Sequence, residues 1–171
     1  MMEEKMPTYR IILQGIVEGV GMRPAIFRYA EHCMVVGSVC NHADFVEIIV
    51  QGAAENCRNF IAHLAENFPP TAQVRIPFDI QELAEDKTYR NFAIRYLEKN
   101  SEKNAALLAM PDTAPCSCCL GELNDPGDRR FGFPFISCGK CGPRASVIQR
   151  LPYERNSTAW GDFPLCPACS G

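Results

Sequence analysis

Three cysteine pairs of one form, Cys-x-x-Cys, constrain the second half of this 171-residue chain more than any other feature. A Cys-x-x-Cys turn places two thiolates on one side of a tight loop, and two such turns provide the four sulfur ligands of a tetrahedral zinc site. The first two pairs therefore predict one zinc ion. Its ligands would be Cys116, Cys119, Cys138 and Cys141.

Disulfide bonds or free thiols are the alternatives for these cysteines. The first ten residues lack the apolar run of a signal peptide, and no stretch is apolar enough for a membrane helix. We therefore expect a cytoplasmic protein without a membrane partner, in a reducing compartment where paired Cys-x-x-Cys turns bind metal more often than they form disulfides. The composition, 47% hydrophobic and 22% charged, is typical of a globular protein.

The third pair, Cys166 and Cys169, has no fourth pair to complete it. Either the chain is a fragment cut inside a repeating zinc array, or the two cysteines have another use. We expect a fragment, in which this incomplete second site is weakly held or shared with another chain. Cys116 and Cys118 are an alternative pair of metal ligands, but the Cys-x-x-Cys spacing favours Cys116 with Cys119. Lone cysteines are usually small core residues, so we expect no ligands at Cys33, Cys40, Cys57 and Cys118.

Residues 8–97 show the pattern of a mixed α/β domain. Alternating apolar residues predict strands around residues 9–13, 35–40, 45–50, 76–80 and 92–96. Apolar residues recur at helical spacing after Pro24 and again over residues 57–64. Pro69 and Pro70 end the second of these predicted helices. The order is β-α-β-β-α-β with a further strand, which predicts an α+β, ferredoxin-like fold: one antiparallel sheet with two helices on one face.

The rest of the chain predicts a linker and a small metal-dependent domain. Residues 98–110 are charged and then rich in alanine and leucine, as expected of a linker. Residues 111–171 are dominated by proline, glycine and cysteine. So small a segment buries too little apolar surface to fold without a metal. We therefore place domains at 1–97 and 111–171.

The join between the first strand and the first helix, residues 15–24, has the form of an anion site. Its glycines allow successive backbone N–H groups to turn inward, and the helix dipole adds positive potential. Arg23 provides a planar fork of donors suited to a phosphate. The alternative is a plain glycine turn with a surface arginine.

The run Val17-Glu-Gly-Val-Gly-Met-Arg-Pro24 resembles the signature of the acylphosphatase family, and Gly37-Ser-Val-Cys-Asn41-His-Ala-Asp44 resembles its second motif. The resemblance implies catalysis by Arg23 and Asn41: Arg23 would bind the phosphate and Asn41 would orient the attacking water. It implies hydrolysis of a carboxyl-phosphate anhydride without a metal. The phosphate or sulfate would bind at Gly19, Val20, Gly21, Met22 and Arg23.

Three residues depart from the family pattern. Glu18 replaces a glutamine, Met22 replaces a phenylalanine, and Phe45 stands where a glycine is favoured. We expect the Glu18 side chain to point outward into solvent, because the loop amides are what the anion site needs. Without the matching loop, Asn41 would be interpreted as a turn residue.

The cysteine-rich segment resembles the zinc-finger-like region of the HypF family of hydrogenase-maturation carbamoyltransferases. The resemblance rests on Cys116-x-x-Cys-Leu-x-Glu-Leu-x-Asp-Pro126, Arg129-Arg-Phe-x-Phe-Pro-Phe135, Cys138-x-x-Cys-Gly-Pro-Arg144 and Leu151-Pro-Tyr-Glu-Arg155. In that family the region follows an acylphosphatase domain.

The resemblance implies carbamoyl phosphate as the substrate and HypE as a partner of the full-length protein. In that family the C-terminal cysteine of HypE receives the carbamoyl group, which later becomes a cyanide ligand of nickel–iron hydrogenases. ATP would be used only by domains absent from this chain, and the zinc would be structural.

Two other functions are alternatives. Zinc knuckles with nearby arginines bind nucleic acid in some proteins, but residues 111–171 carry six Lys/Arg and six Asp/Glu. Counterion release needs an excess of positive charge, so we expect no nucleic-acid partner. A self-contained acylphosphatase with a zinc-dependent docking module is the second alternative, which the incomplete third cysteine pair disfavours.

Overall fold

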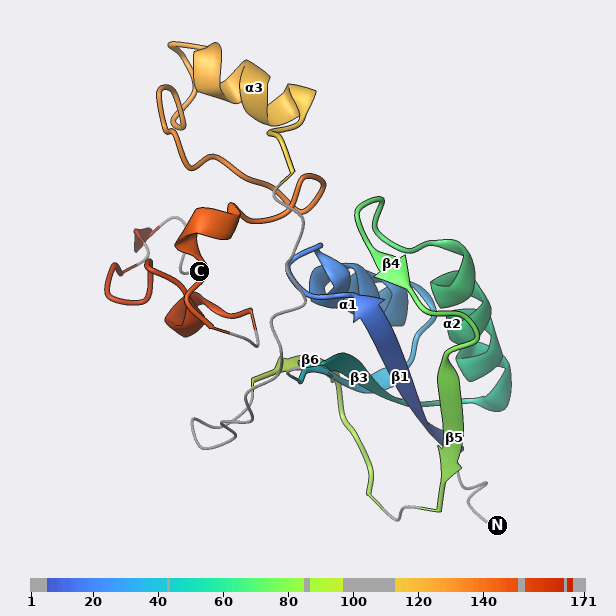
Figure 1. Cartoon of the computed structure of the whole chain (residues 1–171). Helices are drawn as coiled ribbons and strands as arrows, with labels where there is room; N and C mark the ends of the chain where they lie inside the picture. Colours follow the sequence, from blue (N-terminus) through green and yellow to red (C-terminus); the bar gives the residue numbers. More distant parts are fainter. Residues whose placement is uncertain are drawn as a thin grey trace.

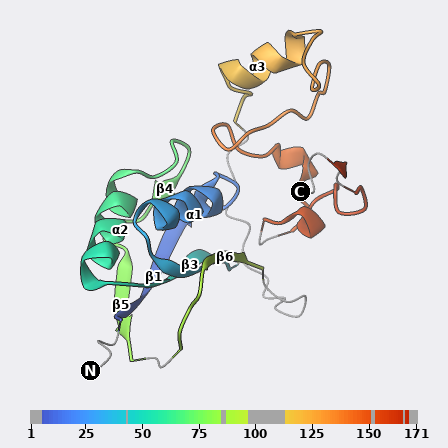
Figure 2. The same cartoon turned by 180° about the vertical axis from the view of Figure 1, so that it is seen from behind.

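The computed structural model describes residues 6–42, 44–84, 87–96, 113–150, 153–164 and 166–167. Residues 6–96, here called the α/β part, form a twisted sheet with two helices on one face (Figures 1 and 2). Residues 113–167, the cysteine part, contain one short helix and two 3₁₀ turns and lie to one side of the sheet. The predicted α+β architecture is confirmed. The predicted linker, 98–110, falls outside the described residues, and so do the proposed domain boundaries at 97 and 111.

The elements follow the chain in a simple order. They are β1 (Thr8–Ile16), α1 (Met22–His32), β2 (Val36–Asn41), β3 (Phe45–Gln51), α2 (Ala54–Glu66), β4 (Gln73–Val74), β5 (Asp79–Leu83), β6 (Phe92–Arg95) and α3 (Ser117–Asn124), with 3₁₀ turns at Ala145–Val147 and Arg155–Ser157.

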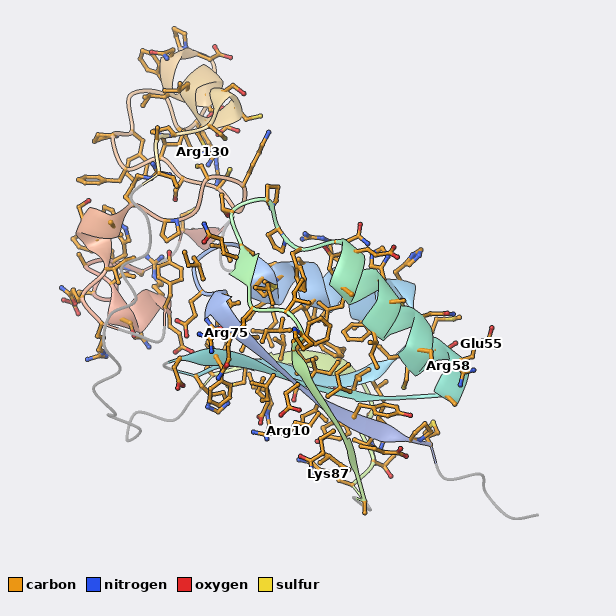
Figure 3. All side chains as sticks on the ribbon, turned by 45° about the vertical axis from the view of Figure 1, so that its right-hand side comes forward. Arg10, Glu55, Arg58, Arg75, Lys87 and Arg130 are labelled. Carbon is orange, nitrogen blue, oxygen red and sulfur yellow. The ribbon has the colours of Figure 1, made fainter. Side chains whose placement is uncertain are left out.

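Alternation along β1 divides its side chains between the two faces of the sheet. Ile11 and Leu13 are fully buried beneath the helices. Arg10 lies on the opposite face, where its Nε donates to Glu47 Oε1 at 2.7 Å (Figure 3). The hydrophobic core therefore lies between the sheet and α1 and α2, with Ile26, Phe60 and Leu64 supplied by the helices.

The sheet has the order β4-β1-β3-β2-β6, with β5 also paired to β1. The predicted antiparallel sheet needs one correction: β6 pairs with β2 in parallel, whereas the pairings of β1 with β3, β4 and β5 and of β2 with β3 are antiparallel. After β5 the chain crosses to the far edge of the sheet and reverses direction there, so β6 runs the same way as β2 (Figure 1).

The strand predicted around residues 76–80 begins later than expected. It starts at Asp79, and the Ile76 side chain is 70% exposed. A two-residue strand, β4, precedes it and was not predicted, since two residues carry no periodicity.

The cysteine part has a small core of its own. Cys119, Ile136 and Cys141 are buried together, and Cys116, Leu123 and Cys138 pack against them. This core is far smaller than the one in the α/β part, as expected of a segment that depends on a metal.

Candidate active site and cysteine cluster

The loop between β1 and α1 folds as a tight turn held by two glycines. Gly19 and Gly21 adopt φ values of 65° and 77°, in the left-handed region that favours glycine. Gly21 is also the N-cap of α1. The side chains of Val17, Val20 and Met22 are buried in the core, which fixes the loop in place. The first turn of α1 contains no acidic residue, so its free N–H groups remain favourable to an anion.

Arg23 and Asn41 line one pocket of 210 Å³, although they come from different elements. Arg23 lies in the first turn of α1, and Asn41 is the last residue of β2. Of the other predicted phosphate-binding residues, Gly19, Gly21 and Met22 also line the pocket. Among the described residues the Asn41 Oδ1 atom, which is buried, has no hydrogen-bond partner. It is free to accept a hydrogen bond from a ligand or a water.

Arg23 is held by residues far from it in the chain. Its Nη2 donates to the main-chain oxygen of Tyr153 at 2.7 Å, and its Nη1 lies 3.5 Å from Glu154 Oε1. Its Cζ stands 5.4 Å from the ring centroid of Tyr96. Burial raises the pKa of the Glu154 carboxyl, and the Arg23 guanidinium partly offsets this. Sequence reasoning missed Tyr153 and Glu154, because no spacing relates them to the loop.

Glu18 corrects another expectation, since it does not point into solvent. Its side chain is only 8% exposed, and its Oε2 accepts a hydrogen bond from the Tyr153 N–H at 2.6 Å. Burial raises the pKa of Glu18 to about 7, although the Tyr153 hydrogen bond and the Arg23 charge act in the opposite direction. The expectation failed because it treated the loop as solvent-facing, whereas the cysteine part packs against it.

Backbones of the two parts approach closely at four glycines. A Cβ atom on Gly21 would lie 3.0 Å from the oxygen of Gly139, and one on Gly142 would lie 3.2 Å from the oxygen of Gly19. The turn that carries Cys138 and Cys141 therefore rests directly on the β1–α1 loop.

The four predicted zinc ligands lie together. Cys116 and Cys119 stand at the start of α3, and Cys138 and Cys141 close a turn with an antiparallel bridge between Cys138 and Gly142. All four Sγ atoms lie within 4.8 Å of one another, and the neighbouring Sγ···Sγ distances are 3.7–3.8 Å. A tetrahedron with Zn–S bonds of about 2.3 Å has sulfur–sulfur edges of about 3.8 Å. The donor set thus fits zinc.

Arg144 supports this cluster from outside it. The buried guanidinium donates from Nη2 to Cys141 Sγ at 3.1 Å and to the Gly142 oxygen at 2.9 Å. Burial by itself would raise the pKa of the Cys141 thiol, but hydrogen bonds with the main chain at Cys116 and Cys138 outweigh it and lower that pKa. Sequence reasoning had placed Arg144 in the motif Cys138-x-x-Cys-Gly-Pro-Arg144 without giving it a role at the cluster.

The remaining cysteines stand apart from the cluster. Cys33, Cys40 and Cys57 are buried, whereas Cys118 is exposed. Within the described ranges, the four clustered cysteines are the only grouping of His, Cys, Asp or Glu suited to a metal ion. Cys166 is exposed, and Cys169, its predicted partner, lies outside the described residues.

Comparisons with known proteins identify the first part. The acylphosphatase family model matches residues 9–94. An acylphosphatase from Bordetella parapertussis is 38% identical over 94 residues, which cover 54% of this chain and 98% of that protein. The chain belongs to the acylphosphatase family. Its α/β part is a hydrolase domain of that type.

The cysteine part is matched over residues 116–148 by the HypF finger. The "Probable carbamoyltransferase HypF" of Methanocaldococcus jannaschii is 39% identical over 148 residues, which are 86% of this chain and 19% of that protein. A crystal structure of full-length HypF in the phosphate- and nucleotide-bound form is 36% identical with a TM-score of 0.84, covering 97% of this chain and 21% of that one. The HypF structure from T. kodakarensis is 36% identical with a TM-score of 0.75, covering 96% and 20%. This chain therefore spans about a fifth of the length of its HypF relatives and carries an acylphosphatase domain followed by a HypF finger.

No helix in the described ranges combines the length and apolar character needed to span a membrane.

Proposed function

We propose that the acylphosphatase domain hydrolyses carbamoyl phosphate in the pocket lined by Arg23 and Asn41. One observation carries the proposal: a guanidinium from α1 and an amide from β2 line the same pocket, beside the glycine loop that caps α1. The HypF relatives are carbamoyltransferases by name, which supports a carbamoyl substrate.

The proposed reaction uses each group for what its chemistry allows. The N–H groups of residues 19–23 and the Arg23 guanidinium bind the phosphoryl oxygens and stabilise their charge. The Asn41 Oδ1 accepts a hydrogen bond from a water and directs its oxygen at phosphorus. The water oxygen forms the new bond to phosphorus, the bond from phosphorus to the carbamoyl oxygen breaks, and carbamate leaves with that electron pair. The proton of the water passes to the products or solvent.

The cysteine part holds a structural zinc in this proposal. Four thiolates fill a tetrahedral coordination sphere, so no position remains for a substrate, and Cys119 and Cys141 are buried. The zinc supplies folding free energy to a segment with a very small core.

For a protein of HypF length that contains such a chain, we propose the following role. It uses carbamoyl phosphate and ATP to place a carbamoyl group on the C-terminal cysteine of HypE, for the cyanide ligands of nickel–iron hydrogenases, in the cytoplasm. Supporting this, the chain is similar to carbamoyltransferases HypF over most of its length. We assign the ATP-dependent step to parts of the longer protein outside this chain.

Phosphate release from carbamoyl phosphate tests the proposal. Arg23→Ala and Asn41→Ala should each lower kcat/KM by about 100-fold or more, because removal of one group that stabilises transition-state charge costs about 3–4 kcal/mol. Arg58→Ala is the matched control: it removes the same charge from an exposed position on α2, on the far side of the domain from the cysteine part (Figure 3). Unchanged hydrolysis by Arg23→Ala would refute the assignment.

A further inference from the structure

Two consecutive residues of the cysteine part hold the guanidinium of Arg23. Its Nη2 donates to the main-chain oxygen of Tyr153 at 2.7 Å, and its Nη1 lies 3.5 Å from Glu154 Oε1. We call these two groups, the Tyr153 oxygen and the Glu154 carboxylate, the clamp. Tyr153 lies 130 positions further along the chain than Arg23, so the α/β part does not supply the clamp itself.

The clamp is anchored to the α/β part and shielded from solvent. The Tyr153 N–H donates to Glu18 Oε2 at 2.6 Å, so Glu18 and Arg23 hold the two polar main-chain atoms of one residue. The side chains of Arg23 and Glu154 are only 13% and 14% exposed. Their attraction is therefore screened less than that of a pair on the surface.

The clamp leaves donors of Arg23 available to a ligand. A guanidinium carries five N–H donors in one plane, and the Tyr153 oxygen accepts from one of its nitrogens. Within the described ranges, Arg23 Nη1 and Glu154 Oε1 make no hydrogen bond. Arg23 lines the pocket, whereas Glu154 does not. The Glu154 carboxylate therefore acts on the guanidinium through its charge, from outside the pocket.

We propose that Glu154 is a positioning residue of the acylphosphatase site, whose carboxylate holds the Arg23 guanidinium where it can bind phosphate. This role rests on the proposed function and deepens it, because it assigns part of the site's geometry to the cysteine part. An arginine side chain has many rotamers, and ordering it on binding costs affinity. The clamp orders Arg23 before the phosphate arrives.

Glu154 has two effects on a bound phosphate, and they oppose each other. Its negative charge repels the anion, while its hold on Arg23 favours binding. The repulsion is reduced because the Arg23 charge neutralises the carboxylate and because Glu154 does not line the pocket. We therefore expect positioning to dominate, so that loss of Glu154 weakens phosphate binding.

The test uses the zinc-loaded 171-residue chain and two measurements. Calorimetric titration gives the Kd for inorganic phosphate, and phosphate release gives kcat and KM for carbamoyl phosphate. Glu154→Ala should raise Kd and KM together, by about fivefold or more. Glu154→Gln should do nearly the same, since the contact depends on charge rather than on a hydrogen bond. A merely structural role would lower the apparent kcat and the number of binding sites, and the intact fraction would keep its Kd and KM.

Glu122→Ala is the matched control. It also removes a paired carboxylate from the cysteine part, but Glu122 pairs with Arg130 of the same part and does not line the pocket. Its Kd and KM should stay within about twofold of the wild-type values, because a partly exposed pair contributes little.

The outcomes separate this role from the proposed function. Unchanged Kd and KM in the Glu154 variants would overturn the role and leave the proposed function standing. Tighter phosphate binding would overturn it too, because Glu154 would then compete with the phosphate for Arg23. Wild-type values in Glu154→Gln alone would show that shape, not charge, is what matters. A wild-type chain that bound phosphate without hydrolysing carbamoyl phosphate would refute the proposed function, and the phosphate Kd would still decide the role of Glu154.

Discussion

Arg23 is the residue at which the two parts of the chain meet. Its guanidinium lines the pocket proposed to hold phosphate, yet its contacts come from Tyr96 at the end of the sheet and from Tyr153 and Glu154 in the cysteine part. An arginine fixed in this way loses less conformational entropy when it binds a phosphate. The cysteine part thus contributes to the geometry of a site whose chemistry belongs to the α/β part.

Glu18 makes the contact between the parts sensitive to pH. Its pKa in the folded chain, about 7, lies above the ordinary value of 4.5. The native state therefore holds the proton more tightly than the unfolded state. The stability that this provides is complete below pH 4.5 and is lost as the pH rises through 7. Glu18→Gln does not titrate, and its side-chain oxygen can still accept from Tyr153. The unfolding free energy of Glu18→Gln minus that of wild type should therefore be larger at pH 8 than at pH 5, by about 1–3 kcal/mol.

Urea denaturation of both proteins at the two pH values measures this gain, because effects of the substitution that do not depend on pH cancel. Glu55→Gln, at an exposed position in the first turn of α2, serves as the control and should show no such gain. A difference between Glu18→Gln and wild type that is the same at both pH values would refute the buried, proton-binding role of Glu18.

At the scale of elements, the β1–α1 loop and the Cys138–Gly142 turn form one structural unit. Each contributes a glycine in the left-handed region whose missing Cβ permits close backbone approach to the other, Gly21 against Gly139 and Gly142 against Gly19. The loop that would bind phosphate and the turn that would bind zinc are therefore adjacent, and a shift in one displaces the other.

Alanine substitutions at two glycines of the cysteine part distinguish the effect of local backbone strain from the effect of this contact. Gly142 and Gly132 have similar φ values, 73° and 68°, but only Gly142 has a neighbour across the boundary. Substitution of either by alanine should cost about 1–2 kcal/mol of stability, the cost of a left-handed conformation. Only Gly142→Ala should also raise the KM for carbamoyl phosphate, by about fivefold or more, because it presses on the oxygen of Gly19. Equal KM values in the two variants would show that the turn does not influence the loop.

Sequence periodicity was sufficient for the helices and the main strands because their buried faces repeat at fixed spacing, as in Ile11 and Leu13 of β1. It could not determine the direction of β6, which depends on where a crossing connection ends. At the site, motif resemblance pointed to Arg23 and Asn41, and paired spacing pointed to the four cysteines. The burial of Glu18 and the role of Tyr153 depend on a contact between residues 135 positions apart, and no local pattern reports such a contact.

The whole molecule has two unequal cores joined at one functional boundary. The α/β part buries a large apolar cluster and has relatives that consist of this domain alone, such as the acylphosphatase of Bordetella parapertussis. The cysteine part buries little beyond Cys119, Ile136 and Cys141. The two parts should therefore differ in what keeps them folded: apolar burial in the first and a bound metal in the second.

Removal of the metal should consequently unfold one part and spare the other. We expect one zinc per chain by metal analysis, and Cys119→Ser should reduce it to about zero because three thiolates bind zinc far more weakly than four. The only tryptophan of the chain, Trp160, packs against Phe133, Phe135 and Phe163 in the cysteine part, so its fluorescence reports on that part alone. Its emission should shift to the red in Cys119→Ser, whereas the far-ultraviolet circular dichroism of the α/β part persists.

Cys118→Ser is the control, because it alters the exposed neighbour of Cys119 outside the cluster, and it should keep the zinc and the native emission. A chain that retains its zinc after Cys119→Ser, or that keeps native Trp160 emission without zinc, would contradict a structural four-cysteine site.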